Sequence, residues 1–274
     1  MIEAVLGNVP VIDSTRNQLS RQEITPLMNE VVLTLDTDWA PDFAIDFVAA
    51  ELISRKIKAT WFITHNSPAI KKLFKYPDLF EIGIHPNFLS GSTQGKSVEE
   101  VLRYCFALVP KATSMRTHSL FQSTPLLQQI ATETTITTDV SLFLPRATLL
   151  KPVEYRWKDR TLLRIPYCWE DDFEMERNSP DWNFPTRAVS EQGLKVFNFH
   201  PMHIYLNSGN MESYKKLKQQ FPRLSDLTEV DKQFVQTGSG ARTAFLQLID
   251  LLAGRGDSAR IIDVHERWQE RSAK

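Results

Sequence analysis

Two carboxylates stand at the end of a predicted strand and have the spacing of a cation-binding pair. Residues 31–36 are mostly apolar or β-branched, and Asp36 and Asp38 occupy positions i and i+2 at their end. Side chains two residues apart on a strand point to the same side, so both carboxylates should face one small volume. Carboxylates this close repel each other unless they bind a cation or share a proton. We therefore interpret Asp36 and Asp38 as functional, and Asp42, which follows Pro41, as an ordinary helix cap.

Most other ionisable candidates outside helices also follow predicted strands. His85 ends the third strand, Arg116 and His118 end the fourth, residues 170–172 follow the sixth, and His200 ends the seventh. Each alone has an ordinary interpretation as a buried hydrogen-bonded histidine, an ion-pair partner or a solvated acidic loop. Together with the two aspartates they favour metal-assisted hydrolysis.

The elements that position these residues alternate along the chain. Apolar runs predict strands, and helical periodicity or capping signals predict most of the segments between them. The predicted strands are 31–36, 58–63, 79–85, 113–118, 134–143, 161–167 and 194–199, with a short last strand at 261–264. Residues 170–190 are predicted to be a long surface loop, and residues 241–253 a helix capped by Gly254.

Repeated βα units of this kind predict an α/β fold with a parallel sheet and outer helices. We expect a seven- to eight-stranded (β/α) barrel, which could be distorted or incompletely closed, with its active site at the C-terminal ends of the strands. We expect residues 31–274 to form this single domain. Residues 1–30 are predicted to be an N-terminal arm or an extra strand or helix.

Composition excludes several classes of protein. The 274 residues suffice for a large core, and 42% hydrophobic and 24% charged residues are globular values. A net charge of −1 gives no argument for nucleic acid or an anionic membrane surface. No apolar run has the length of a membrane span, and no basic region followed by an apolar stretch opens the chain. We expect a soluble cytoplasmic protein with Cys105 and Cys168 as free buried thiols, and the sequence indicates no oligomeric state.

The ordered motifs resemble those of the polysaccharide deacetylases, carbohydrate esterase family four. Residues 33–38 (LTLDTD) look like that family's first motif, a strand Thr-Phe-Asp-Asp-Gly, and residues 58–63 (KATWFI) are similar to its second strand. Residues 81–85 (EIGIH) match the start of its second motif. Residues 116–118 (RTH) stand where the family has Arg-x-Pro, and residues 197–200 (FNFH) look like its last motif.

The resemblance implies a divalent metal, with Zn²⁺ the expected ion. Asp38 and His85 match two of the family's ligands, although Thr37 separates the two aspartates that are adjacent in the family. The family's second metal histidine corresponds to Leu89, which cannot bind a metal. His118 is our first choice for the missing ligand, and Asn87 is the second.

The resemblance also implies a mechanism of amide hydrolysis. A metal held by these ligands would lower the pKa of a bound water and polarise the acetyl carbonyl. Asp36, held ionised by Arg116, accepts the proton of the water, and His200 protonates the departing amine. Asp171 or Asp172 keeps His200 protonated, as a carboxylate does in the family.

The substrate implied is an acetylated sugar or glycan. A nucleotide-linked or lipid-linked N-acetyl sugar of surface-polysaccharide biosynthesis fits the expected compartment better than chitin or peptidoglycan. Candidates for stacking on the sugar ring are Trp169, Phe173, Trp182 and Phe184. Two alternatives stay open: a non-catalytic glycan-binding module on a decayed deacetylase fold, and a metal-independent amidohydrolase of the allantoinase type.

Overall fold

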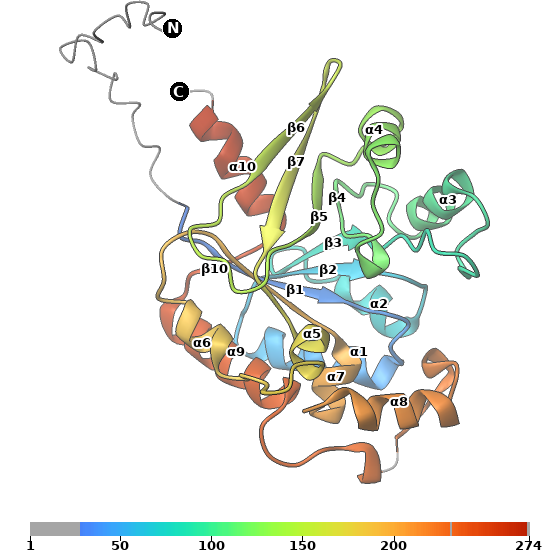
Figure 1. Cartoon of the computed structure of the whole chain (residues 1–274), viewed down its shortest axis with the longest axis vertical. Coiled ribbons are helices and arrows are strands. Elements are labelled where there is room, and N and C mark those ends of the chain that lie inside the picture. Colours follow the sequence, from blue (N-terminus) through green and yellow to red (C-terminus); the bar gives the residue numbers. More distant parts are fainter. Residues whose placement is uncertain (1–27, 231, 273–274) are drawn as a thin grey trace, which may run out of the picture.

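A sheet of ten strands with helices around it forms the described part of the chain (Figure 1). The computed structural model describes residues 28–230 and 232–272. Nearly all of the predicted N-terminal arm, residues 1–30, therefore lies outside the described residues. The strands are β1 (Val31–Asp36), β2 (Ala59–Ile63), β3 (Phe80–Ile84), β4 (Ser114–Met115), β5 (Thr138–Phe143), β6 (Val153–Trp157), β7 (Arg160–Tyr167), β8 (Trp169–Glu170), β9 (Lys195–Phe199) and β10 (Ser258–Ala259).

The strand order confirms an α/β barrel that is incompletely closed. It runs β6-β7-β5-β4-β3-β2-β1-β9-β8, with β10 beside β1, and of these strand pairs β6–β7 is antiparallel and the others are parallel. β8 follows β7 directly along the chain and pairs with β9, which brings the two ends of the sheet together. Hydrogen bonds between the end strands β6 and β8 do not close the sheet.

Helices follow most of the strands, as the βα pattern predicts. They are α1 (Asp42–Ser54), α2 (Pro68–Leu73), α3 (Val98–Leu108), α4 (Thr124–Glu133), α5 (Asp171–Met175), α6 (Phe184–Ala188), α7 (Pro201–Leu206), α8 (Met211–Gln220), α9 (Ala241–Arg255) and α10 (Ile261–Ser272). Serine side chains at positions 67, 97 and 123 accept a backbone N–H in the first turn of α2, α3 and α4. Such caps satisfy N–H groups that have no partner within the helix.

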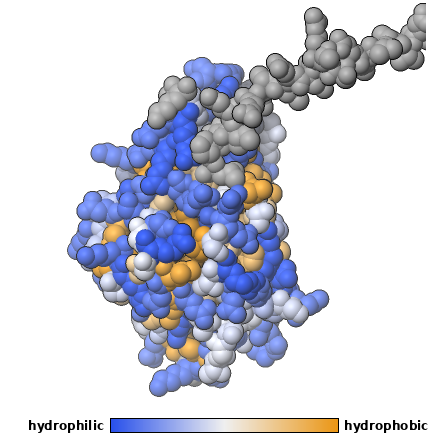
Figure 2. Space-filling model, turned by 90° about the vertical axis from the view of Figure 1, so that its left-hand side faces the viewer, coloured by the Kyte–Doolittle hydropathy of each residue, from blue (hydrophilic) through white to orange (hydrophobic). Residues whose placement is uncertain are grey.

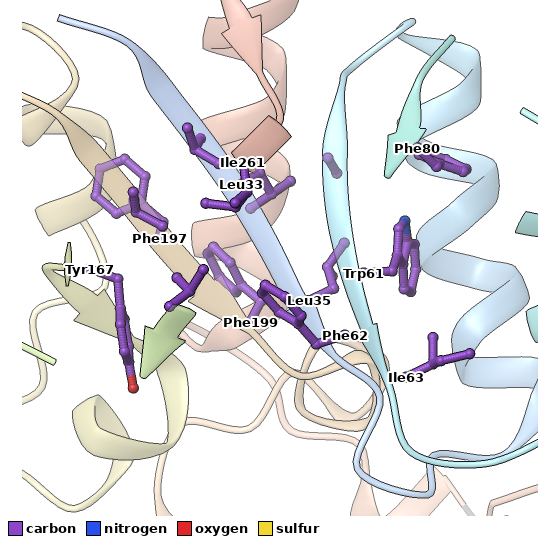
Figure 3. Packing of buried hydrophobic residues seen from close by; sticks show 14 of the residues in the cluster. Leu33, Leu35, Trp61, Phe62, Ile63, Phe80, Tyr167, Phe197, Phe199 and Ile261 are labelled. Carbon is purple, nitrogen blue, oxygen red and sulfur yellow. The ribbon is translucent and has the colours of Figure 1, made fainter. Parts of the chain in front are cut away.

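Alternation along the strands separates an apolar outer layer from a polar interior. Trp61 and Ile63 lie on one side of β2 and Phe62 on the other (Figure 3). On β9, Phe199 packs on Phe245 of α9, with ring centroids 5.6 Å apart. Asn198, the residue before Phe199, is fully buried and hydrogen-bonds Asp36 and Thr34. Because side chains alternate between the two faces of a strand, the polar ones are directed into one enclosed interior.

The surface and the thiols agree with the composition. In the view of Figure 2, hydrophilic residues cover most of the face and hydrophobic ones lie among them in smaller groups. None of the described helices has the length and apolar character needed to span a membrane. Cys105 and Cys168 are free and buried, and burial raises the pKa of each thiol to about 12.

The predicted last strand at residues 261–264 is wrong, because this segment begins α10. A four-residue apolar run fits a buried helical turn as well as a strand. The buried Glu81 accepts the backbone N–H of Ile262, and Thr60 accepts that of Ile261. These two side chains come from β2 and β3, so local sequence gives no sign of this cap.

Three further predictions need correction. Residues 170–190 are not a plain loop, since they contain α5 and α6. The fourth strand spans only Ser114–Met115, and the hairpin strand β6 was not predicted because it is short and mostly exposed. Helix α9 continues past Gly254 and ends at Arg255, where Gly256 takes the left-handed conformation with φ 67°.

Candidate metal centre and active site

Asp38 reaches the site through a left-handed turn that follows β1. The strand ends at Asp36, and Asp38 and Trp39 have φ of 41° and 54°. Non-glycine residues rarely adopt this conformation, and it persists where the surroundings fix it. Thr64 accepts the backbone N–H of Trp39, and Ala40 donates its N–H to the carbonyl of Thr37. These bonds hold the turn that aims the Asp38 carboxylate inward.

Asp38, His85 and His118 bring one atom each to a common point. Nε2 of His85 lies 3.1 Å from Oδ1 of Asp38, and Nδ1 of His118 lies 3.3 Å from the same oxygen. The two histidine nitrogens are 3.3 Å apart. The three atoms thus form a nearly equilateral triangle, made by the residues that the sequence predicts as ligands.

This triangle fits a divalent metal better than a set of hydrogen bonds. Tetrahedral zinc with bonds of about 2.0–2.1 Å separates its ligand atoms by about 3.3 Å. Oδ1 of Asp38 is buried and, among the described residues, has no hydrogen bond despite its two close nitrogens. Burial alone would raise the pKa of Asp38, but the close contacts and charges of His118 and His85 hold it well below its usual range. A ligand carboxylate needs this ionised state.

Leu89 stands at the position of the family's second metal histidine, and Asn87 lies two residues before it. Neither side chain belongs to the triangle. The side-chain oxygen of Asn87 accepts the N–H of Leu89, which turns its loop. Leu89 itself is exposed. His118, which lies in the 3-10 turn His118–Leu120 after β4, supplies the third atom of the triangle instead.

Asp36 lies beside the triangle in a buried polar network. Its Oδ1 accepts Nη1 of Arg116 at 3.0 Å, and its Oδ2 accepts Nδ2 of Asn198 at 3.0 Å. Arg116 also donates to the side chains of Asn198 and Thr34 and to the carbonyl of Val140. Both carboxylate oxygens of Asp36 are therefore fixed by donors, and the arginine charge is fully enclosed.

The Arg116 guanidinium also lies between two aromatic rings. Its central carbon is 4.9 Å from the centroid of Phe62 and 4.4 Å from that of Tyr167, two rings shown in Figure 3. A Cβ on Gly83 would approach the Phe62 ring to 2.8 Å, so only glycine leaves room for this ring. Cation–π contact and hydrogen bonds together fix the arginine that faces Asp36.

His200 faces the site from the end of β9 with Asp171 behind it. Its Nδ1 lies 2.6 Å from Oδ1 of Asp171, and its backbone N–H donates to the other oxygen at 2.9 Å. Its Nε2 lies 3.7 Å from Oδ2 of Asp38. Burial would lower the pKa of His200, but the charge and hydrogen bond of Asp171 raise it well above the usual range. Of the two predicted partners, Asp171 is the one in direct contact.

Three side chains around His200 were given no individual role from sequence: those of Tyr167, Glu170 and His203. Single ligand atoms of Asp36, Glu170 and His200 all lie within 4.8 Å of one another. Burial and the charge of Asp172 raise the pKa of Glu170 well above its usual range, and Tyr167 donates to it at 2.8 Å. Burial and the charge of His200 hold the pKa of the buried His203 well below normal.

Of the four aromatic residues predicted to stack on a sugar, two lie in the core, Phe184 is half-buried and Phe173 is exposed. Trp169 and Trp182 are buried, and Phe173 packs on Phe143 with ring centroids 5.1 Å apart. Trp39 is instead the half-buried ring next to the triangle, 5.3 Å from the ring of His118. Sequence reasoning missed Trp39 because the turn that presents it is not recognisable from residue types.

Asn198 donates a hydrogen bond to Asp36 in this network, and we expect its loss to slow the acetyl hydrolysis that the sequence resemblance implies. We expect Asn198→Ala to lower kcat by roughly 10- to 100-fold, because a hydrogen bond to a charged group is lost. Metal content should stay at the wild-type level. The same substitution in an Asp36→Asn background should have little further effect, because Asn198 acts through Asp36. Additive losses of kcat in the double variant would show that it acts elsewhere.

Comparison with protein families identifies the class of protein to which this fold and site belong. Residues 33–218 match the WbmS-like polysaccharide deacetylase family. The match spans more than half of the chain, and the protein belongs to this family of deacetylases. The resemblance to carbohydrate esterase family four, the enzyme class and the fold predicted from sequence are thereby confirmed.

Three solved structures resemble the chain to different degrees. WbmS of Bordetella bronchiseptica, described as a candidate polysaccharide deacetylase involved in O-antigen biosynthesis, is 30% identical over 82% of this chain and 91% of that chain, with a TM-score of 0.68. The peptidoglycan deacetylase PdaC of Bacillus subtilis is 12% identical over 89% of this chain and 93% of that chain, with a TM-score of 0.44. A family 4 acetyl xylan esterase of Clostridium thermocellum, in complex with a cobalt ion, is 13% identical over 85% and 89%, with a TM-score of 0.44. No protein with a curated description matches the chain.

Proposed function

We propose that the protein removes an N-acetyl or O-acetyl group from a sugar with the help of one Zn²⁺ held by Asp38, His85 and His118. The observation that carries this proposal is the triangle of ligand atoms with sides of 3.1–3.3 Å. Two imidazoles and one carboxylate suit zinc better than magnesium or calcium, which prefer oxygen ligands. Three protein ligands leave a position open for chemistry, as in catalytic zinc sites.

A zinc ion bound there would lower the pKa of a bound water and polarise the acetyl carbonyl. Asp36 takes the role of general base, with Arg116 and Asn198 fixing the direction of its two oxygens. The enclosed guanidinium of Arg116 lies 3.0 Å from this carboxylate and holds it in place. Because these partners are buried and hydrogen-bonded to the carboxylate, the base is already oriented before substrate binds.

His200 takes the role of general acid toward the leaving group. Asp171 occupies Nδ1, so the proton available for transfer is on Nε2, which faces Asp38 and the site. The raised pKa of His200 keeps Nε2 protonated at neutral pH. A sugar amine leaves poorly without a proton, and this arrangement delivers one.

The pH dependence of kcat should report this pair. A group with a raised pKa holds its proton below that pKa and loses it as pH rises through it, so His200 sets the alkaline limit. Asp171→Asn removes the charge but keeps an oxygen for Nδ1. We expect the alkaline limb of the kcat–pH profile to move to lower pH by roughly 1–3 units. An unmoved limb with normal metal content would remove Asp171 from this role.

The substrate we propose is a nucleotide-linked or lipid-linked N-acetyl sugar of surface-polysaccharide biosynthesis. Support comes from the similarity to a protein connected with O-antigen biosynthesis. The experiment is acetate release by the zinc-loaded protein from N-acetylated sugar nucleotides, N-acetylated oligosaccharides and an activated acetyl ester. Acetate from at least one sugar substrate supports the proposal. Glycan binding without any acetate release would favour the non-catalytic binding module.

A further inference from the structure

A cavity beside the metal centre extends toward basic side chains that the proposed chemistry does not use. It has a volume of about 530 Å³, and Asp38 and Trp39 lie on its wall together with Lys218 and Arg223. Lys218 belongs to α8 and Arg223 to the segment that follows it. The cavity thus connects the reacting centre to a cationic wall.

The two cations have no acidic partner among the described residues. None of the ion pairs in residues 28–230 and 232–272 includes Lys218 or Arg223, while Lys216 of the same helix pairs with Glu212 at 2.7 Å. Nζ of Lys218 lies 5.8 Å from the ring centroid of Tyr214. Both side chains are exposed, so their charges are available to a ligand in the cavity.

The acidic residues on the same wall do not cancel these charges. They are Asp38, whose charge serves the metal, and Asp226, which accepts the hydroxyl of its neighbour Ser225 at 3.3 Å. Apart from the metal centre, the wall carries two cations and one anion, and burial lowers the pKa of its His65, which favours the neutral imidazole. An anion is therefore favoured there over a neutral or cationic group.

The rest of the wall suits a sugar. Trp39 and Tyr104 are half-buried aromatic residues on it, and Asn87 adds a polar amide. Aromatic faces pack on the apolar side of sugar rings, and amides hydrogen-bond hydroxyl groups. The volume is within the range of small-molecule sites, about 300–1,000 Å³. A sugar placed with its acetyl group at the triangle would have its substituents facing Lys218 and Arg223.

We propose that Lys218 and Arg223 form an anion subsite that binds a phosphate or carboxylate group carried by the acetylated sugar. This inference rests on the proposed deacetylase function and narrows its substrate to anionic sugars. Two sources share this chemistry: the phosphate of a nucleotide-linked or lipid-linked sugar, and the carboxylate of a sugar acid. Arginine and lysine both suit such oxyanions, arginine in a two-pronged arrangement and lysine as a point charge.

The test compares kcat/KM for three substrates with the same N-acetyl group: a neutral sugar, its sugar phosphate or nucleotide, and its uronic acid. Wild type should prefer at least one anionic substrate over the neutral one. Lys218→Gln and Arg223→Gln should each lower the ratio of anionic to neutral kcat/KM by roughly 3- to 10-fold, because exposed contacts are partly screened. Asp226→Asn should raise that ratio, because it removes the opposing charge. A fall of the ratio for the sugar phosphate or nucleotide identifies the bound anion as a phosphate, and a fall for the uronic acid identifies it as a carboxylate.

Matched controls separate the subsite from general charge effects. Lys215→Gln removes an exposed charge from α8, and Arg103→Gln removes one from α3; neither residue lies on the cavity wall. Both should leave the ratio unchanged. Binding of inorganic pyrophosphate and glucuronate, followed by calorimetry, gives a second readout that does not need turnover.

The outcomes keep the two proposals apart. Acetate release from neutral and anionic sugars with equal efficiency, and no change of ratio in either variant, would overturn the anion subsite and leave the deacetylase function in place. Equal losses in the control variants would also overturn it. Failure to release acetate from any substrate would instead count against the proposed function. Even then, the binding measurements test the subsite: it is rejected if Lys218→Gln and Arg223→Gln do not weaken the binding of pyrophosphate or glucuronate.

Discussion

Asp36→Asn should lower the rate of deacetylation by roughly 10²–10⁴-fold, the usual loss for a general base. Asparagine keeps the shape of the side chain but cannot accept the proton of a water. Asp36 is not part of the ligand triangle, so zinc content should stay near one ion per chain. Rates of acetate release and metal analysis of the same preparation check both halves of this expectation.

His200→Ala provides the comparison for the acid. We expect a loss of similar size with an N-acetyl sugar, whose amine needs a proton to leave, and a much smaller loss with an activated acetyl ester. Asp36→Asn should be slow on both substrates, because attack by water is needed in each case. If Asp36→Asn kept full activity, the base would lie elsewhere and the assignment at residues 36–38 would be wrong.

Asp36→Asn should also be less stable, which a control must take into account. It leaves the enclosed Arg116 charge without its anionic partner, and breaking a buried pair this way costs about 3–5 kcal/mol. The free energy of unfolding should therefore fall, and assays belong well below the melting temperature of the variant. Retained zinc in the folded variant shows that its inactivity is chemical.

His118→Ala should weaken zinc binding by more than about 100-fold, as much as His85→Ala does. Losing a partner that only supports a ligand already costs about 10–100-fold, and each of these histidines supplies a ligand atom itself. Asn87→Ala should weaken binding far less, because its side-chain oxygen accepts the N–H of Leu89. Zinc titration with a competing chelator measures each variant.

His265→Ala is the matched control, since this histidine of α10 hydrogen-bonds Thr138 and belongs to none of the possible metal groups found in the described residues. Its zinc affinity should equal that of wild type. Unchanged affinity in His118→Ala would move the third ligand to another residue or to water. Full occupancy in both His85→Ala and Asp38→Ala would remove the centre from this place altogether.

The parallel strands were predictable because their signals are local. The runs that became β1, β2, β3, β5, β7 and β9 are apolar, β-branched and bounded by turn or helix signals, so period and composition identify them. The start of α10 was not predictable, since its first N–H groups are capped by Thr60 and Glu81 from distant strands. The pairing of β6 with β7 likewise depends on tertiary contacts that an exposed five-residue segment does not reveal.

The residues predicted for the site lie close together in the structure, but the sequence did not predict the geometry that brings them there. Asp36 follows the strand period, whereas Asp38 joins it through a left-handed turn and His118 through a 3-10 turn. Both reach the expected place by a route other than strand alternation. Asn198 and Trp39 were missed, because a buried asparagine on a strand and an aromatic residue after it look like ordinary core residues until their contacts are seen.

The dependence of acetate release on zinc tests the central claim most directly. Metal-free protein, titrated with zinc, should gain activity in proportion to bound metal and reach its maximum at about one ion per chain. Asp36→Asn should bind the same single ion and stay at least roughly 100-fold slower. Full activity of the metal-free wild type, unchanged by added zinc, would contradict the account and favour the metal-independent amidohydrolase.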